Sequence, residues 1–130
     1  CGQRRAERGR ARFGGSMGGS EIARGVEFDT IAREWRMKWS EDDDKASLVA
    51  VQEALNACLP KIKALDGVIE VNRVVCGACH DFKVITSMPA EKFSLWGAAE
   101  FAPEKEFLSQ VKDVPGIYKV ETQTFTFMKM

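Results

Sequence analysis

The residues whose types and spacing most resemble a chemical site are Cys76, Cys79 and His80, in the run Cys-Gly-Ala-Cys-His at 76–80. The C-x-x-C-H pattern attaches c-type haem, and its two thiols also suit a redox pair or half of a zinc site. His80 is the only histidine of the chain. These residues are therefore either a cofactor site or the tip of a tight turn.

The neighbouring residues argue against a haem or a metal ion. Strand-like β-branched runs at 68–75 and 82–86 lie on both sides of the motif. A haem needs an apolar pocket around a large macrocycle, and strands already committed to a sheet leave little room for one. A structural zinc needs four ligands, but the other cysteines, Cys1 and Cys58, form no second C-x-x-C. We therefore expect no cofactor and no metal ion.

Two interpretations of Cys76 and Cys79 remain open. A thioredoxin-like pair places its first cysteine at a helix N-terminus, whereas a strand pattern follows Cys79. A redox-sensitive pair of another kind remains an alternative, because the adjacent His80 could perturb the Cys79 thiol. The simpler prediction is a hairpin turn in which Gly77 supplies the permissive backbone and the two cysteines face each other across the strands.

Composition indicates a globular protein with an unusual N-terminal segment. Of the 130 residues, 45% are hydrophobic and 29% are charged, and the net charge is zero. Residues 1–25 hold six arginines against two glutamates, a charge of +4, while the remainder holds 13 basic and 17 acidic residues, a charge of −4. Seven of the eleven glycines also lie in this segment, which is therefore basic and chemically distinct from the rest.

We interpret residues 1–27 as a basic, Gly/Arg-rich extended arm. Its composition is typical of an organelle transit sequence or of the residues just behind one, and it needs a partner to become ordered. The run RGRARFGG is typical of RNA-binding tails, but the acidic domain lacks the aromatic stretches of an RNA-binding sheet, so we expect no nucleic-acid partner. The predicted protein-binding residues are Arg4, Arg5, Arg8, Arg10, Arg12 and Phe13.

The beginning of the remaining chain, residues 28–130, predicts a strand followed by a helix. Trp35, Met37 and Trp39 alternate with charged residues, which is typical of a half-buried strand. Apolar residues then recur every three or four positions over 48–65, which predicts an amphipathic helix. Ser40 and Asp43 have capping-box spacing at its start, and Pro60 should kink or restart it.

The second half of the chain completes an α+β pattern. The runs at 68–75 and 82–86 predict two strands, residues 90–97 and the segment after Pro103 predict two short helices, and residues 118–130 predict a last strand. The order strand, helix, strand, strand, helix, strand is that of a ferredoxin-like split βαβ fold (βαββαβ). We expect one domain with a four-stranded antiparallel sheet and helices on one face.

The sequence suggests neither an enzyme nor a membrane-spanning protein. No Ser/His/Asp set or convergent carboxylate pair can be assembled from the pattern, so we expect no catalytic residue. The acidic run 41–44 lacks the spacing of a calcium loop and suits a helix N-terminus. No apolar run approaches the roughly 20 residues needed to cross a bilayer, so any membrane association would be peripheral.

Residues 68–130 resemble the effector-binding domain of Lrp/AsnC-type regulators. The matching stretches are IEVNRVV, DFKVITSM and PGIYKVETQTFTFM. The resemblance implies ferredoxin-like topology, association through the sheets and a small effector near the turn between the middle strands. Gly77 and Asp81 depart from the glycine–aspartate spacing of that family, and the arm stands where a helix-turn-helix should precede the domain, so a DNA-binding regulator is not implied.

A second resemblance covers nearly all of residues 28–130. The stretches FDTIAREWRMKWSEDDDKASL, RVVCGACHDFKVITSMPAEKF, FAPEKEFL and VETQTFTF are similar to plastid proteins of red-lineage algae. They resemble the small stromal-side accessory subunits of diatom-type photosystem I. This resemblance implies a non-catalytic extrinsic subunit on the stromal face of the thylakoid, with pigments only in its neighbours.

The resulting expectation is a binding protein. The arm and one face of the sheet would dock on protein subunits of a larger membrane complex and on the peripheral membrane surface. The alternative is a ligand-sensing or redox-sensitive homo-oligomer that uses the turn from Cys76 to Asp81.

Overall fold

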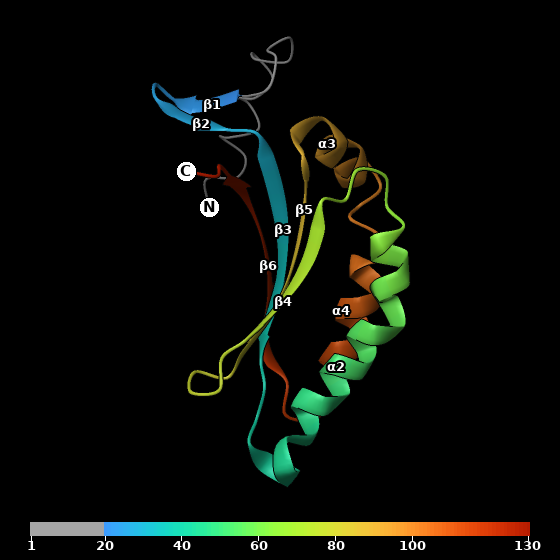
Figure 1. The fold of residues 1–130 in the computed structure, drawn as a ribbon. Helices are drawn as coiled ribbons and strands as arrows, with labels where there is room; N and C mark the ends of the chain where they lie inside the picture. Colours follow the sequence, from blue (N-terminus) through green and yellow to red (C-terminus); the bar gives the residue numbers. More distant parts are fainter. Residues whose placement is uncertain (1–19) are drawn as a thin grey trace.

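The computed structural model describes residues 20–130. These residues build a four-stranded antiparallel sheet in the order β4-β5-β3-β6, and the helices cover one face of it (Figure 1). This is the strand order of the predicted ferredoxin-like fold. The six residues of the arm predicted to bind protein lie outside the described part: Arg4, Arg5, Arg8, Arg10, Arg12 and Phe13.

The elements follow the predicted order, with an added hairpin at the start. The sheet consists of β3 (Thr30–Lys38), β4 (Glu70–Val75), β5 (Asp81–Pro89) and β6 (Tyr118–Phe127). Helix α2 (Asp42–Lys63) connects β3 to β4, while α3 (Ala90–Ala98) and α4 (Glu104–Lys112) connect β5 to β6. The added hairpin consists of β1 (Ser20–Ala23) and β2 (Val26–Phe28).

The added hairpin lies in the stretch that the sequence assigned mostly to the arm. Its turn contains Gly25, whose φ of +80° is a left-handed conformation that glycine adopts without steric cost. The Gly25 N–H donates a hydrogen bond to Glu21 Oε2 at 3.2 Å. The glycine-rich composition that suggested an extended arm thus also permits this tight turn.

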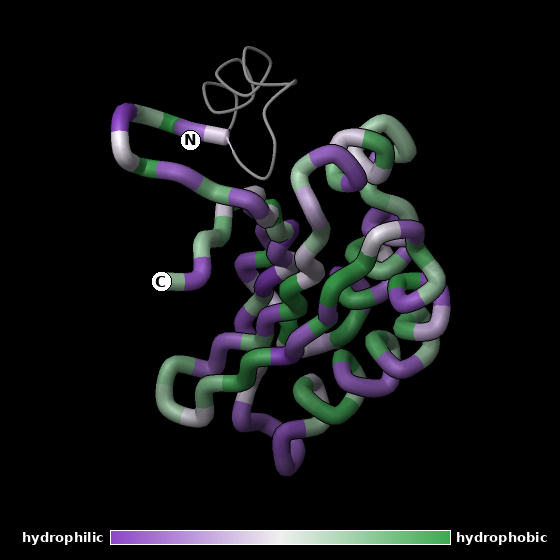
Figure 2. The backbone as a smooth tube through the Cα atoms, turned by 45° about the horizontal axis from the view of Figure 1, so that its top comes forward, coloured by the Kyte–Doolittle hydropathy of each residue, from purple (hydrophilic) through white to green (hydrophobic). Residues whose placement is uncertain are grey.

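The core lies between the sheet and the helices, and β3 is its central strand. Trp35, Met37 and Trp39 are each 1% exposed. They share the helix-facing side of the sheet because strand residues two apart point the same way. Val51 and Ile62 of α2 are fully buried against this face. In Figure 2 hydrophobic and hydrophilic residues alternate along stretches of the chain. Strand β3 is more buried than the predicted half-buried strand, because Ala32 and Glu34, which point to the other face, are only 0% and 5% exposed.

Helix α2 begins differently from the predicted capping box. The Ser40 hydroxyl accepts a hydrogen bond from Asp42 N–H at 3.0 Å, and Ser47 Oγ accepts one from Ser40 N–H at 2.9 Å. Asp43, Asp44 and Lys45 have φ between 54° and 63°, so the end of the acidic run and the next residue are left-handed rather than part of a regular first helical turn. The helix then runs through Pro60 to its end.

Within residues 20–130, no helix is both long enough and apolar enough to cross a membrane. The longest, α2, has 22 residues and carries acidic side chains in its first turn and lysines in its last. This finding agrees with the lack of a spanning segment in the sequence, whereas the plastid location remains a prediction.

Candidate functional site

The C-x-x-C-H motif lies at the tip of the hairpin between β4 and β5, which confirms the hairpin interpretation. Cys76 and Cys79 are joined by a disulfide. Cys76 N–H donates to Asp81 O and His80 N–H donates to Cys76 O, each at 3.0 Å. The left-handed backbone position is His80, with φ of 64°, and not Gly77 as predicted. The backbone hydrogen bonds close the turn around His80, and Gly77 does not supply the left-handed residue of the turn.

Charged side chains from three elements surround this turn. His80 Nε2 lies 2.9 Å from Glu41 Oε2, and the His80 ring packs on Trp39 at a centroid distance of 4.6 Å. Lys38 Nζ contacts Asp81 Oδ1 at 2.7 Å and donates to Cys79 O at 2.9 Å. The hydrogen bond from His80 lowers the pKa of Glu41. Within residues 20–130, no cluster of three or more His, Cys, Asp and Glu side chains is placed to hold a metal ion.

We expect the Lys38→Met substitution to raise the pKa of Asp81 toward its ordinary value of 3.8. The hydrogen bond from Lys38 lowers that pKa, because it favours the charged carboxylate. Since the folded-state pKa is lower than the unfolded one, this contact stabilises the fold above pH 3.8, and the stabilisation is lost as the pH falls through the folded-state pKa.

An NMR titration of the Asp81 carboxyl carbon measures this pKa in both proteins. Lys61→Met is the control, because Lys61 is exposed, forms its ion pair with the exposed Glu106 at 3.8 Å, and forms none with Asp81. An Asp81 pKa that is equal in wild type and Lys38→Met would contradict the role assigned to Lys38.

A second polar group is buried between the sheet and the helices. Arg33 of β3 is 8% exposed, and its guanidinium contacts the Glu104 carboxylate at 2.8 Å through Nε and at 3.1 Å through Nη2. The same guanidinium donates to Thr124 Oγ1 at 2.8 Å and to Thr122 Oγ1 at 3.1 Å. This bidentate geometry, with the two threonine hydroxyls as added acceptors, compensates the cost of burying the charge pair.

Aromatic rings enclose this ion pair. Trp35 Nε1 donates to Glu104 Oε1 at 2.7 Å, so one carboxylate accepts hydrogen bonds from both an indole and a guanidinium. Phe107 stacks on Trp35 at 5.1 Å, and the Arg33 guanidinium lies 4.1 Å from the centre of the Phe101 ring. Glu104 is also the first residue of α4, where the helix dipole favours a negative charge.

The sequence did not predict this cluster, although one signal for it exists. Arg33 precedes Trp35 by two residues, so in a strand it must lie on the same face as the buried Trp35. A charged residue on a buried face requires a partner, but no pattern identifies that partner as Glu104, which is 71 residues away.

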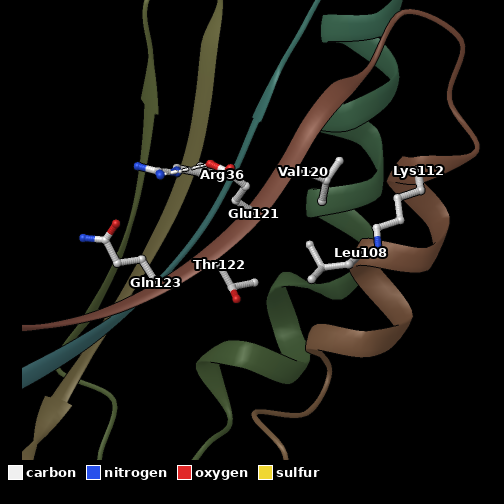
Figure 3. Close-up of a pocket in the computed structure, with 7 residues that line it drawn as sticks. All are labelled: Arg36, Leu108, Lys112, Val120, Glu121, Thr122 and Gln123. Atoms are coloured by element: carbon white, nitrogen blue, oxygen red, sulfur yellow. Dashed lines mark hydrogen bonds and ion pairs between the residues drawn. The ribbon is translucent and has the colours of Figure 1, made fainter. Parts of the chain in front are cut away.

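An open groove of about 480 Å³ runs beside the edge strand β6. Leu108 and Lys112 of α4 line it together with residues of β6 and β3: Arg36, Val120, Glu121, Thr122 and Gln123. Figure 3 shows Val120 and Thr122 directed toward Leu108, whereas Glu121 lies beside Arg36, to which it is ion-paired at 2.9 Å. Because Thr122 also accepts the hydrogen bond from Arg33, the groove adjoins the buried ion pair.

Solved structures with a similar fold are known, but no protein-family model and no curated protein matches the sequence. Rv0793 from Mycobacterium tuberculosis is 13% identical with a TM-score of 0.52, and the match covers 78% of this chain and 97% of that one. SnoaB, a cofactor-independent oxygenase from Streptomyces nogalater, is 12% identical with a TM-score of 0.52, covering 78% and 96%.

A dimeric ferredoxin-like protein from an uncultured marine organism is also similar. It is 10% identical with a TM-score of 0.54, and the match covers 78% of this chain and 90% of that chain. Together with the strand order of the sheet, these similarities confirm the predicted ferredoxin-like α+β fold.

The prediction of a non-catalytic photosystem accessory subunit is wrong. The similar structures include a cofactor-independent oxygenase, and nothing in the fold links the chain to photosystem I or to a chloroplast membrane. The prediction that the chain is not an enzyme is wrong for the same reason, because a protein of similar fold is a cofactor-independent oxygenase.

Proposed function

We propose that the chain binds a polycyclic phenol in the groove beside β6 and oxidises it with molecular oxygen, without a resident cofactor. The observation that carries the proposal is the groove itself, in which apolar side chains and the Lys112 ammonium group adjoin a buried ion pair. SnoaB, which has this fold, is described as a cofactor-independent oxygenase, and this supports the class of reaction.

The groove has the size and lining for such a ligand. Its volume of about 480 Å³ lies in the range of small-molecule sites. Leu108 and Val120 offer apolar contact to an aromatic body, while the Lys112 ammonium group attracts a phenolate oxygen. The Thr122 hydroxyl oxygen accepts a hydrogen bond from Arg33, so the hydroxyl hydrogen is left to donate to a ligand.

In a cofactor-independent oxidation the substrate itself must supply the electrons. A phenol that loses its proton becomes an electron-rich phenolate, and this reacts with O₂ at a ring carbon. That carbon loses hydrogen and gains one oxygen atom, so the phenol and O₂ give a quinone and water. The chain contributes binding, exclusion of water on one side, and the positive charge of Lys112, which favours the phenolate over the phenol.

We expect wild-type protein to consume O₂ in the presence of 1-naphthol, and the Lys112→Met substitution to raise KM roughly tenfold, because a charge-assisted hydrogen bond is lost. An oxygen electrode measures the uptake, and absorbance follows the quinone. Lys105→Met is a matched control on the same helix, because Lys105 does not line the groove. Absence of both naphthol binding and O₂ uptake across a panel of polycyclic phenols would contradict the proposal.

A further inference from the structure

We propose that Cys76 and Cys79 form a reversible thiol–disulfide exchange site, in which an external dithiol attacks the sulfur of Cys79 and Cys76 leaves. The partner that fits is a protein or small molecule that carries two neighbouring thiols. This inference concerns the hairpin between β4 and β5 and does not rest on the proposed oxygenase activity.

The turn gives a partner free access to the disulfide. Figure 1 shows the β4–β5 loop projecting from the sheet, away from the helices. Cys79, Gly77 and Ala78 are exposed, whereas Cys76 is half-buried. A Cβ placed on Gly77 would meet no atom within 4 Å, so nothing in the described part of the chain covers the turn there. An attacking thiolate therefore reaches Cys79 more easily than Cys76.

The surroundings of the two sulfurs differ, and the difference sets the direction of the exchange. The backbone N–H of Cys79 points at Cys76 Sγ at 3.1 Å, so a negative charge on that sulfur would be stabilised by a hydrogen bond. Cys79 Sγ instead lies 3.4 Å from Asp81 Oδ2. A carboxylate at this distance disfavours a thiolate on Cys79 and favours its protonated thiol, which can donate a hydrogen bond to Asp81.

Lys38 keeps Asp81 in its charged form, and this charge is what makes the surroundings of the Cys79 sulfur differ from those of the Cys76 sulfur. Its ammonium group contacts Asp81 Oδ1 at 2.7 Å and lowers the pKa of Asp81, which leaves the second carboxylate oxygen facing Cys79. Lys38 also holds the carbonyl oxygen of Cys79 at 2.9 Å. The Asp81 carboxylate and the Cys79 backbone are thus fixed by a single side chain.

The exchange proceeds in two balanced steps. In the first step, a thiolate of the partner forms a bond to Cys79 Sγ and the bond between Cys79 and Cys76 breaks. The electron pair of the broken bond remains on Cys76 Sγ, which then takes a proton from water. The second thiolate of the partner attacks its own sulfur in the mixed disulfide and releases Cys79, which is protonated beside Asp81. The partner is oxidised to a disulfide, and this protein gains two electrons and two protons.

The turn has the contacts to keep its shape when the disulfide opens. The backbone hydrogen bonds from Cys76 N–H to Asp81 O and from His80 N–H to Cys76 O do not involve sulfur. The contacts of His80 with Glu41 and Trp39 tie the turn to the start of α2 and to the residue after β3. Reduction is therefore local, and the protein stays folded in both forms.

The thiol of Cys58 is less suited to exchange than the two cysteines of the turn. It lies on α2 and is half-buried, and burial raises the pKa of its thiol, which reduces its reactivity near neutral pH. The experiment uses the 130-residue chain with Cys1→Ser and Cys58→Ser, so that only the turn carries thiols.

The first measurement is a count of thiols in the folded protein. Dithiothreitol without denaturant should expose both thiols of the turn to iodoacetamide, and removal of the reductant followed by mild oxidation should restore the disulfide. Circular dichroism confirms that the fold is retained throughout. If the turn gains no thiols until the protein is unfolded, or if the disulfide does not re-form, the exchange site is excluded.

The second measurement tests the asymmetry with single-thiol variants. Cys76 in the Cys79→Ser variant should react with iodoacetamide roughly tenfold faster at neutral pH than Cys79 in the Cys76→Ser variant, because thiolate content controls the rate. Adding Asp81→Asn should accelerate Cys79. Asp66→Asn should not, because Asp66 forms a comparable ion pair with Lys92, at 2.8 Å, on another part of the surface. Equal rates for Cys76 and Cys79, or no effect of Asp81→Asn, would overturn the assigned roles.

Discussion

Replacing Glu104 with alanine is expected to lower the free energy of unfolding by about 3 to 5 kcal/mol, because the substitution leaves a buried charge without a partner. Arg33 is 8% exposed and contacts both carboxylate oxygens of Glu104. The indole N–H of Trp35 would lose its acceptor at the same time. Urea denaturation followed by circular dichroism measures the change.

Two further variants make this result specific. Glu106→Ala is the matched control on the same helix, because its contact with Lys61 is 3.8 Å long and both side chains are exposed, so we expect a loss below about 0.5 kcal/mol. The double variant Arg33→Met with Glu104→Leu removes both charges and should recover much of the lost stability. A Glu104→Ala protein as stable as Glu106→Ala would contradict the buried ion pair.

The Trp35→Ala substitution is expected to cost about 3 to 5 kcal/mol, because it removes a large buried ring and leaves a cavity. Trp35 is 1% exposed on the central strand and stacks on Phe107 at 5.1 Å, which joins β3 to α4. Thermal unfolding and urea denaturation both report this loss.

The conservative variant Trp35→Phe separates packing from hydrogen bonding. It keeps an aromatic ring but removes the N–H donor to Glu104, so we expect an intermediate loss of about 1 to 3 kcal/mol. Leu95→Ala on α3 is the control, since Leu95 is 64% exposed and its truncation should change stability by less than about 0.5 kcal/mol. If Trp35→Ala were no less stable than Leu95→Ala, the described core would be wrong.

The two proposed sites occupy opposite edges of one sheet. The groove lies along β6, which is one edge strand, and the disulfide lies at the end of β4, which is the other. The buried ion pair adjoins only the groove, through Thr122. Loss of the disulfide and loss of phenol oxidation are therefore separable by mutation, which allows each proposal to be tested independently.

The sequence by itself determined the elements and the fold class. Alternation of Trp35, Met37 and Trp39 with charged residues predicted the central strand, because side chains in a strand point to opposite faces in turn. The β-branched runs on both sides of the motif at 76–80 predicted the hairpin, and the order of elements predicted the ferredoxin-like sheet, as the structure has it. The strands, helices and hairpin depend on residues that are close together in the sequence, so local sequence patterns predict them.

Only the tertiary structure decided the site. Arg33 meets Glu104 because α4 packs against β3 and β6, and the chain of 70 residues between them carries no pattern that predicts the contact. The asymmetry of the two cysteines likewise depends on a backbone N–H and on an Asp81 carboxylate oriented by Lys38. The photosystem role was likewise overturned only by the fold, because the solved structures similar to it include a cofactor-independent oxygenase. Function resides in contacts between residues distant in sequence, and packing of the folded chain sets those contacts.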